Sequence, residues 1–255
     1  YQEVPFSGHF DGANHKIKNM TVMHVPLRTA WKSESQNYDS VQWYSNTGFL
    51  GQIINSTVQN LGLENAAVYS GGSGILCGAV YQGTTIRNCY TTGFSAGNGL
   101  VSMINNYNVT VENCYSAATV LGNGITSVFH ASDSAVGHPV VMKNVFFCGQ
   151  LHSREGSAGG TGFARDVAAF NNNGYAQMLS CFSTAQSLSG VGFAENFSGA
   201  RLQKCYYLSG NRYGIKTKST TANCSLTAKN SSFFKTKSSY TTAANWDSGA
   251  KWDFN

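Results

Sequence analysis

Four cysteines of this sequence stand in one short context that could serve metal or disulfide chemistry. The context reads NCY, NCY, SCF and KCY, and it contains Cys89, Cys114, Cys181 and Cys205. No C-x-x-C pair occurs, and none of the six histidines stands at zinc-ligand spacing from a cysteine pair. The total of seven cysteines is odd, so a monomer keeps at least one free thiol. We therefore expect no metal and no cofactor, and we interpret the four as free core thiols. Disulfides between neighbouring repeats stay open.

The carboxylates give little sign of catalysis. Glycoside hydrolysis needs two carboxylates across a cleft, whereas the twelve acidic residues here are dispersed, with no two closer than four residues. The metalloprotease motif H-E-x-x-H is absent. The segment FDGANH (10–15) contains Asp11, Asn14 and His15, and we interpret it as an Asp-Gly turn. The sequence thus predicts a protein without catalytic residues.

The cysteine context belongs to a repeat. Each unit has an apolar residue, a polar residue, usually Asn, and then an apolar residue or Cys. The units are KIKNMTV (16–22), TVQNLGL (57–63), TIRNCYT (85–91), TVENCYS (110–116), VMKNVFF (141–147), QMLSCFS (177–183) and RLQKCYY (201–207). A second column of Gly followed by an apolar residue recurs between them, from Gly48-Phe49 to Gly214-Ile215. Two columns recurring in one order indicate stacked structural units.

The period and composition favour a β-solenoid. Units of about 25 residues with short strands, Gly/Asn turns and almost no helix signal are typical of that architecture. Charged residues make up 11% of the chain, against an ordinary ~25%, which is typical of a sheet-rich extracellular protein. The sequence therefore predicts an all-β fold, a right-handed parallel β-helix of about seven coils. We place the helix at 1–215, with an insertion at 26–46 and a C-terminal cap or transition segment at 216–255.

Stacking assigns a place to each column. The apolar column and the cysteine column should point into the core, where Cys acts as a small hydrophobe. An Asn that tolerates a left-handed bend should mark one corner of each coil and bond to its neighbours above and below. This structural ladder comprises Asn60, Asn88, Asn113 and Asn144, with Asn19, Ser180 and Lys204 at the matching position of other units.

The residue after the cysteine column is aromatic and should point outward. It forms an expected ladder of Tyr90, Tyr115, Phe146, Phe182 and Tyr206. Exposed rings could stack sugars or bury against a partner, although a self-stacked or covered ladder is the plainer interpretation. The insertion adds Trp31, Trp43 and Tyr44 as further candidate ligand-binding residues, because insertions between coils often carry specific contacts.

The opening PFSGHFDGANHKIKNMTV (5–22) and the following TGFLGQIINSTVQNLGL (47–63) resemble the GLUG-motif repeat family. The ending ANWDSGAKWDFN (244–255) is similar to the W-D…W-D-F ending that often follows such repeats. The resemblance implies a β-helix within a larger secreted or cell-surface polypeptide of bacteria or archaea, as in adhesin-like proteins. It implies no catalytic residue.

Charge and hydropathy limit the classes of molecule that this protein is expected to bind. The net charge is +5, and residues 201–255 hold nine Lys/Arg against two Asp, which we interpret as a solvated terminal face. No apolar run is long enough to span a membrane, and we expect no nucleic-acid partner. We expect a non-catalytic adhesin or spacer that binds a host or environmental glycan or a surface protein. The alternatives are a carbohydrate-active enzyme, such as a polysaccharide lyase or glycosidase, and a self-assembling filament protein.

Overall fold

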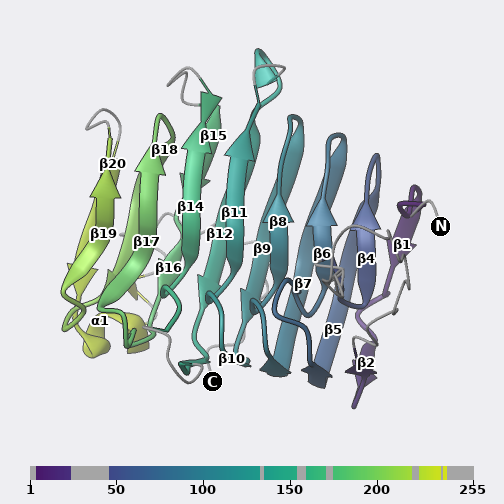
Figure 1. Ribbon diagram of the computed structural model, residues 1–255, viewed down its shortest axis with the longest axis horizontal. Coiled ribbons are helices and arrows are strands. Elements are labelled where there is room, and N and C mark those ends of the chain that lie inside the picture. Colours follow the sequence, from purple (N-terminus) through teal and green to yellow (C-terminus); the bar gives the residue numbers. More distant parts are fainter. Residues whose placement is uncertain are drawn as a thin grey trace, which may run out of the picture.

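The protein is all-β and consists of two parallel sheets whose strands alternate along the chain (Figure 1). The computed structural model describes residues 4–23, 46–132, 135–153, 159–170, 175–219, 224–236 and 238–239. Every strand pair found among these residues is parallel, and after β4 the chain passes back and forth between the two sheets. This arrangement is consistent with a parallel β-solenoid, because each pass adds one strand beside the previous one.

The larger sheet has thirteen strands and the smaller has seven. The larger sheet comprises β1 (His9–Asp11), β2 (Lys16–Lys18), β3 (Thr21–Val22), β5 (Thr57–Val68), β7 (Thr84–Ser95), β9 (Val109–Ser116), β10 (Thr119–Val120), β12 (Val140–Phe147), β13 (Gln150–Leu151), β15 (Ala176–Leu179), β16 (Phe182–Ser183), β18 (Arg201–Leu208) and β20 (Cys224–Lys229). The smaller sheet comprises β4 (Leu50–Ile53), β6 (Cys77–Val80), β8 (Val101–Ile104), β11 (Thr126–Ala131), β14 (Ala164–Ala169), β17 (Val191–Ser198) and β19 (Tyr213–Lys218). A single short helix, α1 (Ser231–Lys235), follows β20 within the described residues.

The long strands of the larger sheet bend at one residue in the left-handed conformation. Asn60, Asn88, Asn113 and Asn144 have φ between 52° and 55°, and Ser180 and Lys204 share this geometry. Asn is the residue other than Gly that adopts this conformation most readily. The bend brings the residues two before and one after it to the core side of the strand. In β12 these are Met142 and Val145, and both have 0% exposure.

The first unit of the repeat pairs in a register that differs from the sequence alignment. Ile17 lies beside Leu63, not beside Val58, so Asn19 joins Asn65 rather than Asn60. The segment GLEN (62–65) carries the same apolar-x-Asn spacing as TVQN (57–60), so the local pattern fits both registers. Strand β1 decides between the two registers, because it pairs with residues 57–59 and so leaves only the later part of β5 for β2. The assignment of Asn19 to the main corner column is therefore wrong.

The main core is an apolar cluster between the two sheets, and Phe182 and Tyr206 form a smaller cluster of their own. Val111, Cys114 and Val145 from the larger sheet have 0% exposure. From the smaller sheet side, Phe163 and Phe193 stack with ring centroids 4.6 Å apart. Because strands of equal register repeat about every 4.8 Å, equivalent side chains stack on one another through the whole core.

The glycine column permits close approach of neighbouring turns. A Cβ placed on Gly124 would overlap the carbonyl oxygen of Gly162, and one on Gly162 would overlap that of Gly192. At these positions the Cα of one turn lies so close to the carbonyl oxygen of the next turn that only glycine, which has no Cβ, fits. The recurring Gly before each strand of the smaller sheet therefore has a packing cause.

Candidate functional site

The predicted aromatic ladder exists as a continuous stack in its first part. Tyr90, Tyr115, Phe146 and Phe182 come from neighbouring strands in register. Successive ring centroids lie 5.0, 4.9 and 4.8 Å apart, with planes within 5° of parallel. The strand spacing fixes these distances, because each ring is carried by the residue beside its neighbour.

The stacking direction decides what the ladder can offer a ligand. Since the planes are parallel and succeed one another along the stack, the face of each ring is largely turned toward the next ring. Solvent meets mainly the ring edges. A sugar stacks on a flat aromatic face, and such a face is not presented by the middle rings, Tyr115 and Phe146. The main role of the ladder is therefore to stabilise the sheet, and its ring edges can form one wall of a binding site beside it.

The N-terminal end of the ladder is closed by a charged cluster. The Tyr90 ring lies over Gly62, where a Cβ would come within 2.5 Å of the ring. The Tyr90 hydroxyl donates a 2.6 Å hydrogen bond to Glu64, which also forms ion pairs with Lys16 at 2.7 Å and Lys18 at 3.4 Å. The hydrogen bonds from Lys16 and Tyr90 lower the pKa of Glu64 to about 2. Burial and the bond to Glu64 raise the pKa of Tyr90.

The C-terminal end of the ladder is covered by α1. Phe234 lies 5.5 Å from Phe182 and Phe233 lies 5.0 Å from Tyr206, measured between ring centroids. Phe182 is 3% exposed and Tyr206 is 8% exposed, as in the plainer interpretation of a covered ladder, and it is the helix α1 that covers these two rings. The Lys229 ammonium lies over the rings of Tyr206 and Phe233. The helix α1 thus leaves only a small part of the last two rings open to a ligand.

A groove of about 450 Å³ opens where the ladder meets α1. Its walls are mainly apolar, and this ladder groove is lined by Phe146, Cys148, Phe182, Thr184, Leu208, Ser231, Phe234 and Lys235. The volume falls in the range of small-ligand pockets, and it has room for apolar side chains of a partner. The ring edges of Phe146 and Phe182 and the side chain of Leu208 make it suited to an apolar group.

The thiol in the ladder groove is a poor nucleophile. Cys148 is partly exposed, but burial of its thiol raises the pKa to about 11. The thiolate is the reactive form, and very little of it exists near neutral pH with such a pKa. Cys148 therefore contributes contact surface rather than covalent chemistry.

The other cysteines lie in or near the core. All seven cysteines fall within the described residues, and all are free thiols. Cys89, Cys114, Cys181 and Cys205 have 0% exposure, and burial raises the pKa of Cys114 and Cys181 well above the usual value. These residues pack as small hydrophobes, and their thiols donate to backbone carbonyls of the strands.

The corner asparagines form a hydrogen-bonded ladder. The amide of Asn88 donates to Asn60 at 2.9 Å, Asn113 donates to Asn88 at 3.3 Å, and Asn144 donates to Asn113 at 3.0 Å. Asp11 accepts from Asn60 at 3.0 Å and ends the series. The Oδ1 atom of Asn144 has no hydrogen-bond partner among the described residues, and the series of amides ends there, since the next corner residue is Ser180. The ladder is structural, as each amide serves its neighbours.

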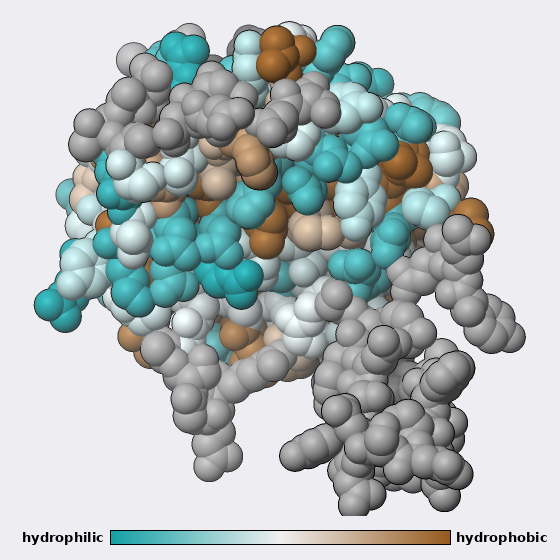
Figure 2. All heavy atoms as spheres, turned by 45° about the horizontal axis from the view of Figure 1, so that its top comes forward, coloured by the Kyte–Doolittle hydropathy of each residue, from teal (hydrophilic) through white to brown (hydrophobic). Residues whose placement is uncertain are grey.

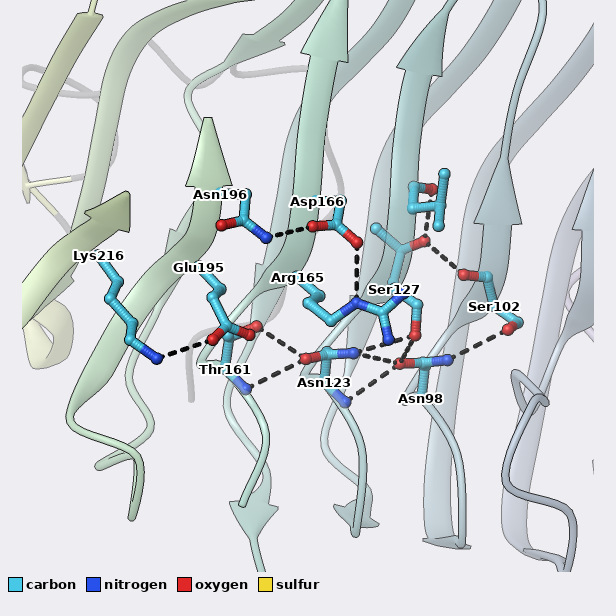
Figure 3. A network of polar contacts seen from close by, with 12 residues as sticks. Asn98, Ser102, Asn123, Ser127, Thr161, Arg165, Asp166, Glu195, Asn196 and Lys216 are labelled. Atoms are coloured by element: carbon cyan, nitrogen blue, oxygen red, sulfur yellow. Dashed lines mark hydrogen bonds and ion pairs between the residues drawn. The ribbon is translucent and has the colours of Figure 1, made fainter. Parts of the chain in front are cut away.

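Acidic residues on the smaller sheet are engaged by bases and amides (Figure 3). Asp166 accepts from Asn196 at 2.5 Å and from Arg165 at 2.8 Å, while Glu195 accepts from Lys216 at 2.9 Å. Burial would raise the pKa of Asp166, but the bonds from Asn196 and Arg165 outweigh it and lower that pKa. A general acid needs a raised pKa, so this carboxyl is poorly suited to that role. No group of three His, Cys, Asp or Glu side chains among the described residues could hold a metal ion.

Sequence reasoning missed a second polar column at the turn into the smaller sheet (Figure 3). Asn98 Oδ1 accepts from the side chains of Asn123 and Ser127, and Asn123 Oδ1 accepts from the backbone and hydroxyl of Thr161. Asn98, Asn123 and Thr161 are at most 6% exposed. Each stands directly before a glycine of the Gly column, which is the signal that could have revealed them. The side chains of this column form hydrogen bonds with one another and with the buried turns, so their role is structural.

The remaining candidate residues of the sequence lie outside the described part of the chain. Trp31, Trp43 and Tyr44 lie outside the described residues, as does the insertion at 26–45. Exposed apolar residues such as Val136, Phe170 and Leu188 occur singly, and Figure 2 shows apolar residues scattered among hydrophilic ones. The described part of the chain contains no helix that is both long and apolar enough to cross a membrane. No family model, curated protein or solved structure matches the chain.

Proposed function

We propose that the chain is a non-catalytic binding module of a secreted or cell-surface protein, built as a right-handed parallel β-helix of about seven coils. The alternating parallel sheets support the architecture. The resemblance of residues 5–22 and 47–63 to GLUG-motif repeats supports a place within a larger surface polypeptide. The proposed partner is a protein, which the module binds through the ladder groove.

The ladder groove is the observation that carries this proposal. Its walls are formed by Phe146, Phe182 and Phe234 with Leu208, and these side chains leave a hollow of about 450 Å³ beside exposed ring edges. An apolar side chain of a protein gains from burial there, at roughly 25 cal/mol per Å² of apolar surface. A glycan would gain less, because the ring faces of the ladder are turned toward each other. A protein partner therefore fits this face better than a sugar.

The ion-pairing of three of the five acidic side chains of the described residues supports a role without catalysis. Glu64, Asp166 and Glu195 are each held in an ion pair. Hydrolysis and lyase reactions need a carboxylate or base that is free to exchange a proton with the substrate. The paired state suits carboxylates that stabilise strands.

Binding arrays of extracellular-matrix proteins and of glycans test the proposal, with the chain and two charge-matched variants. Leu208→Asp places a charge in the ladder groove, whereas Leu188→Asp places one at a site that is already 64% exposed. We expect binding to a matrix protein that Leu208→Asp weakens at least about tenfold, because a charge is desolvated there. Leu188→Asp should bind like the parent, and circular dichroism should show both variants folded.

Three outcomes would overturn the proposal. Binding to glycans alone, lost in Tyr90→Ala/Tyr115→Ala, would show that the ladder rather than the groove recognises the partner. Equal loss in both leucine variants would remove the groove from the site. Absence of any binding would favour a spacer or an assembly role over recognition.

A further inference from the structure

The larger sheet changes its charge along the stack. Its later strands, β12, β13, β15, β16, β18 and β20, contain no Asp or Glu. The same strands carry Lys143, Arg201, Lys204 and Lys229. The acids that the structure pairs lie elsewhere, with Glu64 on β5 and two others on the smaller sheet. These six strands therefore carry only positive charges. Glu112 on the neighbouring β9 is the register partner of Lys143, so one acid of the same sheet lies beside this region.

A polar groove lies at the corner of these strands. It has a volume of about 450 Å³, and we call it the lysine groove. It is lined by Lys143, Leu179, Ser180, Gln203, Lys204 and Ser225. Neighbouring β12, β15 and β18 bring Lys143, Leu179 and Gln203 into one row by their register. Lys204 is the corner residue of β18 and is exposed, with φ of 51°.

The two lysines of this groove differ from others in the protein. Lys16, Lys18 and Lys216 are ion-paired with glutamates, whereas Lys143 and Lys204 form no ion pair with any described acid. Each ammonium carries three donors and no acceptor, so an anionic oxygen is its natural partner. Two lysines without an ion pair to a described acid line one groove, and Glu112 beside Lys143 offsets only part of their charge, so the groove favours a ligand with negative charge.

The remaining lining groups suit a ligand that also carries hydroxyls. Ser225 supplies a hydroxyl group that can donate or accept. The oxygen of Gln203, in its better-satisfied orientation, accepts from the Arg201 guanidinium at 2.6 and 3.1 Å, which leaves the amide NH₂ group as a donor. Leu179 adds a small apolar contact. Carboxylate or sulfate groups with neighbouring hydroxyls are the chemistry of an acidic sugar.

We propose that the lysine groove is a second binding site, which takes an acidic polysaccharide with carboxylate or sulfate groups. A nucleic acid fits less well, because no aromatic side chain lines the groove to stack a base. A second copy of the chain also fits less well, because three of the five acidic side chains of the described residues, Glu64, Asp166 and Glu195, are already paired with bases. The site goes beyond the proposed function, since it lies outside the ladder groove and uses charge rather than apolar contact.

Polysaccharide binding with charge-matched variants tests this site. The probes are polygalacturonate, dextran sulfate and neutral dextran, each immobilised and measured at about 50 mM and about 200 mM salt. Lys143→Gln/Lys204→Gln removes two charges at the lysine groove. Lys16→Gln/Lys18→Gln removes two charges at the opposite end of the larger sheet, so the net charge of the two variants is equal.

We expect binding to at least one acidic polymer, none to neutral dextran, and weakening at the higher salt. The groove variant should lose at least about tenfold in affinity, because it loses two charge-assisted contacts. The control variant should change less than about twofold. Preference for one acidic probe would tell carboxylate from sulfate recognition.

Other results would overturn the site. Equal weakening in both double variants would mean attraction by net charge alone. Tighter binding of a single-stranded oligonucleotide than of either acidic polysaccharide would assign the groove to nucleic acid. No binding to either acidic probe would remove the proposal and leave matrix-protein binding by the ladder groove as a separate question.

Discussion

The hydroxyl of Tyr90 donates a 2.6 Å hydrogen bond to Oε1 of Glu64, and the same oxygen lies 2.7 Å from the ammonium of Lys16. This contact joins the first ring of the aromatic ladder to a charged cluster on the neighbouring strand. It closes the ladder at one end, as α1 covers it at the other. The ladder is therefore bounded by an ion cluster and by a helix, and the ladder groove lies at the helix end.

Acid should weaken the protein through Glu64. Its pKa is lowered from 4.5 to about 2 in the folded state, so the native state binds the proton less readily than the unfolded chain does. This contribution is fully present above about pH 4.5 and is lost as the pH falls toward about 2. In urea unfolding, Glu64→Gln should lower stability at neutral pH and flatten the loss between about pH 4.5 and 3. A variant that keeps the full acid slope would contradict this role.

Alkali should weaken the ladder through Tyr115. Burial, followed by the neighbouring Tyr90, raises the pKa of Tyr115 to about 12 from its ordinary 10.0. A raised folded pKa gives stability that is present below pH 10 and is lost as the pH rises toward 12. Tyr115→Phe keeps the stacked ring and removes the titration. Its unfolding midpoint should fall less than that of the parent above pH 10, whereas an identical fall would count against this explanation.

Gly62 should resist even the smallest side chain. A Cβ there would lie 2.5 Å from the Tyr90 ring, so Gly62→Ala must displace the ring or its strand. Overpacking of this kind costs about 1–3 kcal/mol, and we expect that loss in the free energy of unfolding. Gly51→Ala is the control, because its Cβ would meet only one carbonyl at 3.4 Å. Equal stability of the two variants would show that the ring moves aside freely.

The corner amides should separate a conformational effect from a hydrogen-bond effect. Asn113 has φ of 52° and bonds to the corner amides on both sides. Asn113→Ala loses both and should cost about 2–3 kcal/mol, from about 1–2 for the left-handed backbone and about 1 for the hydrogen bonds. Asn113→Gly keeps the backbone freedom and should cost only about 1 kcal/mol. Chemical denaturation measures both values, and a glycine variant as unstable as the alanine variant would contradict the division.

Thiol labelling should reveal which cysteines solvent reaches. Cys89, Cys114, Cys181 and Cys205 have 0% exposure and should stay unlabelled in the native protein. Cys148 should react slowly at neutral pH and about tenfold faster per pH unit until about 11, because only its thiolate reacts. Cys148→Ser should remove this phase. Cys77 is also buried, so rapid labelling of more than two of the seven thiols without denaturant would mean that the core opens readily.

The sequence determined the repeat, the parallel strands and the main columns of the core. These features are local, because each unit contains the same pattern of apolar, polar and turn residues. Stacking of the units then places equivalent residues side by side. The left-handed corner at Asn88 and Asn113 follows from the preference of asparagine for that conformation. The burial of Cys114 follows from its place one residue after such a corner.

Only the tertiary structure decided the register of the first unit, the burial of the ladder rings and the position of the two grooves. The register of Asn19 depends on the pairing of β1, which its own heptapeptide does not contain. The ring faces of the ladder are turned toward one another because consecutive strands hold the rings parallel. Phe182 is buried because Phe234, about fifty residues later in the chain, lies against it. Both grooves arise in the same way from residues far apart in sequence. Local preference sets the form of each coil, whereas contacts across long separations set the surface that a partner meets.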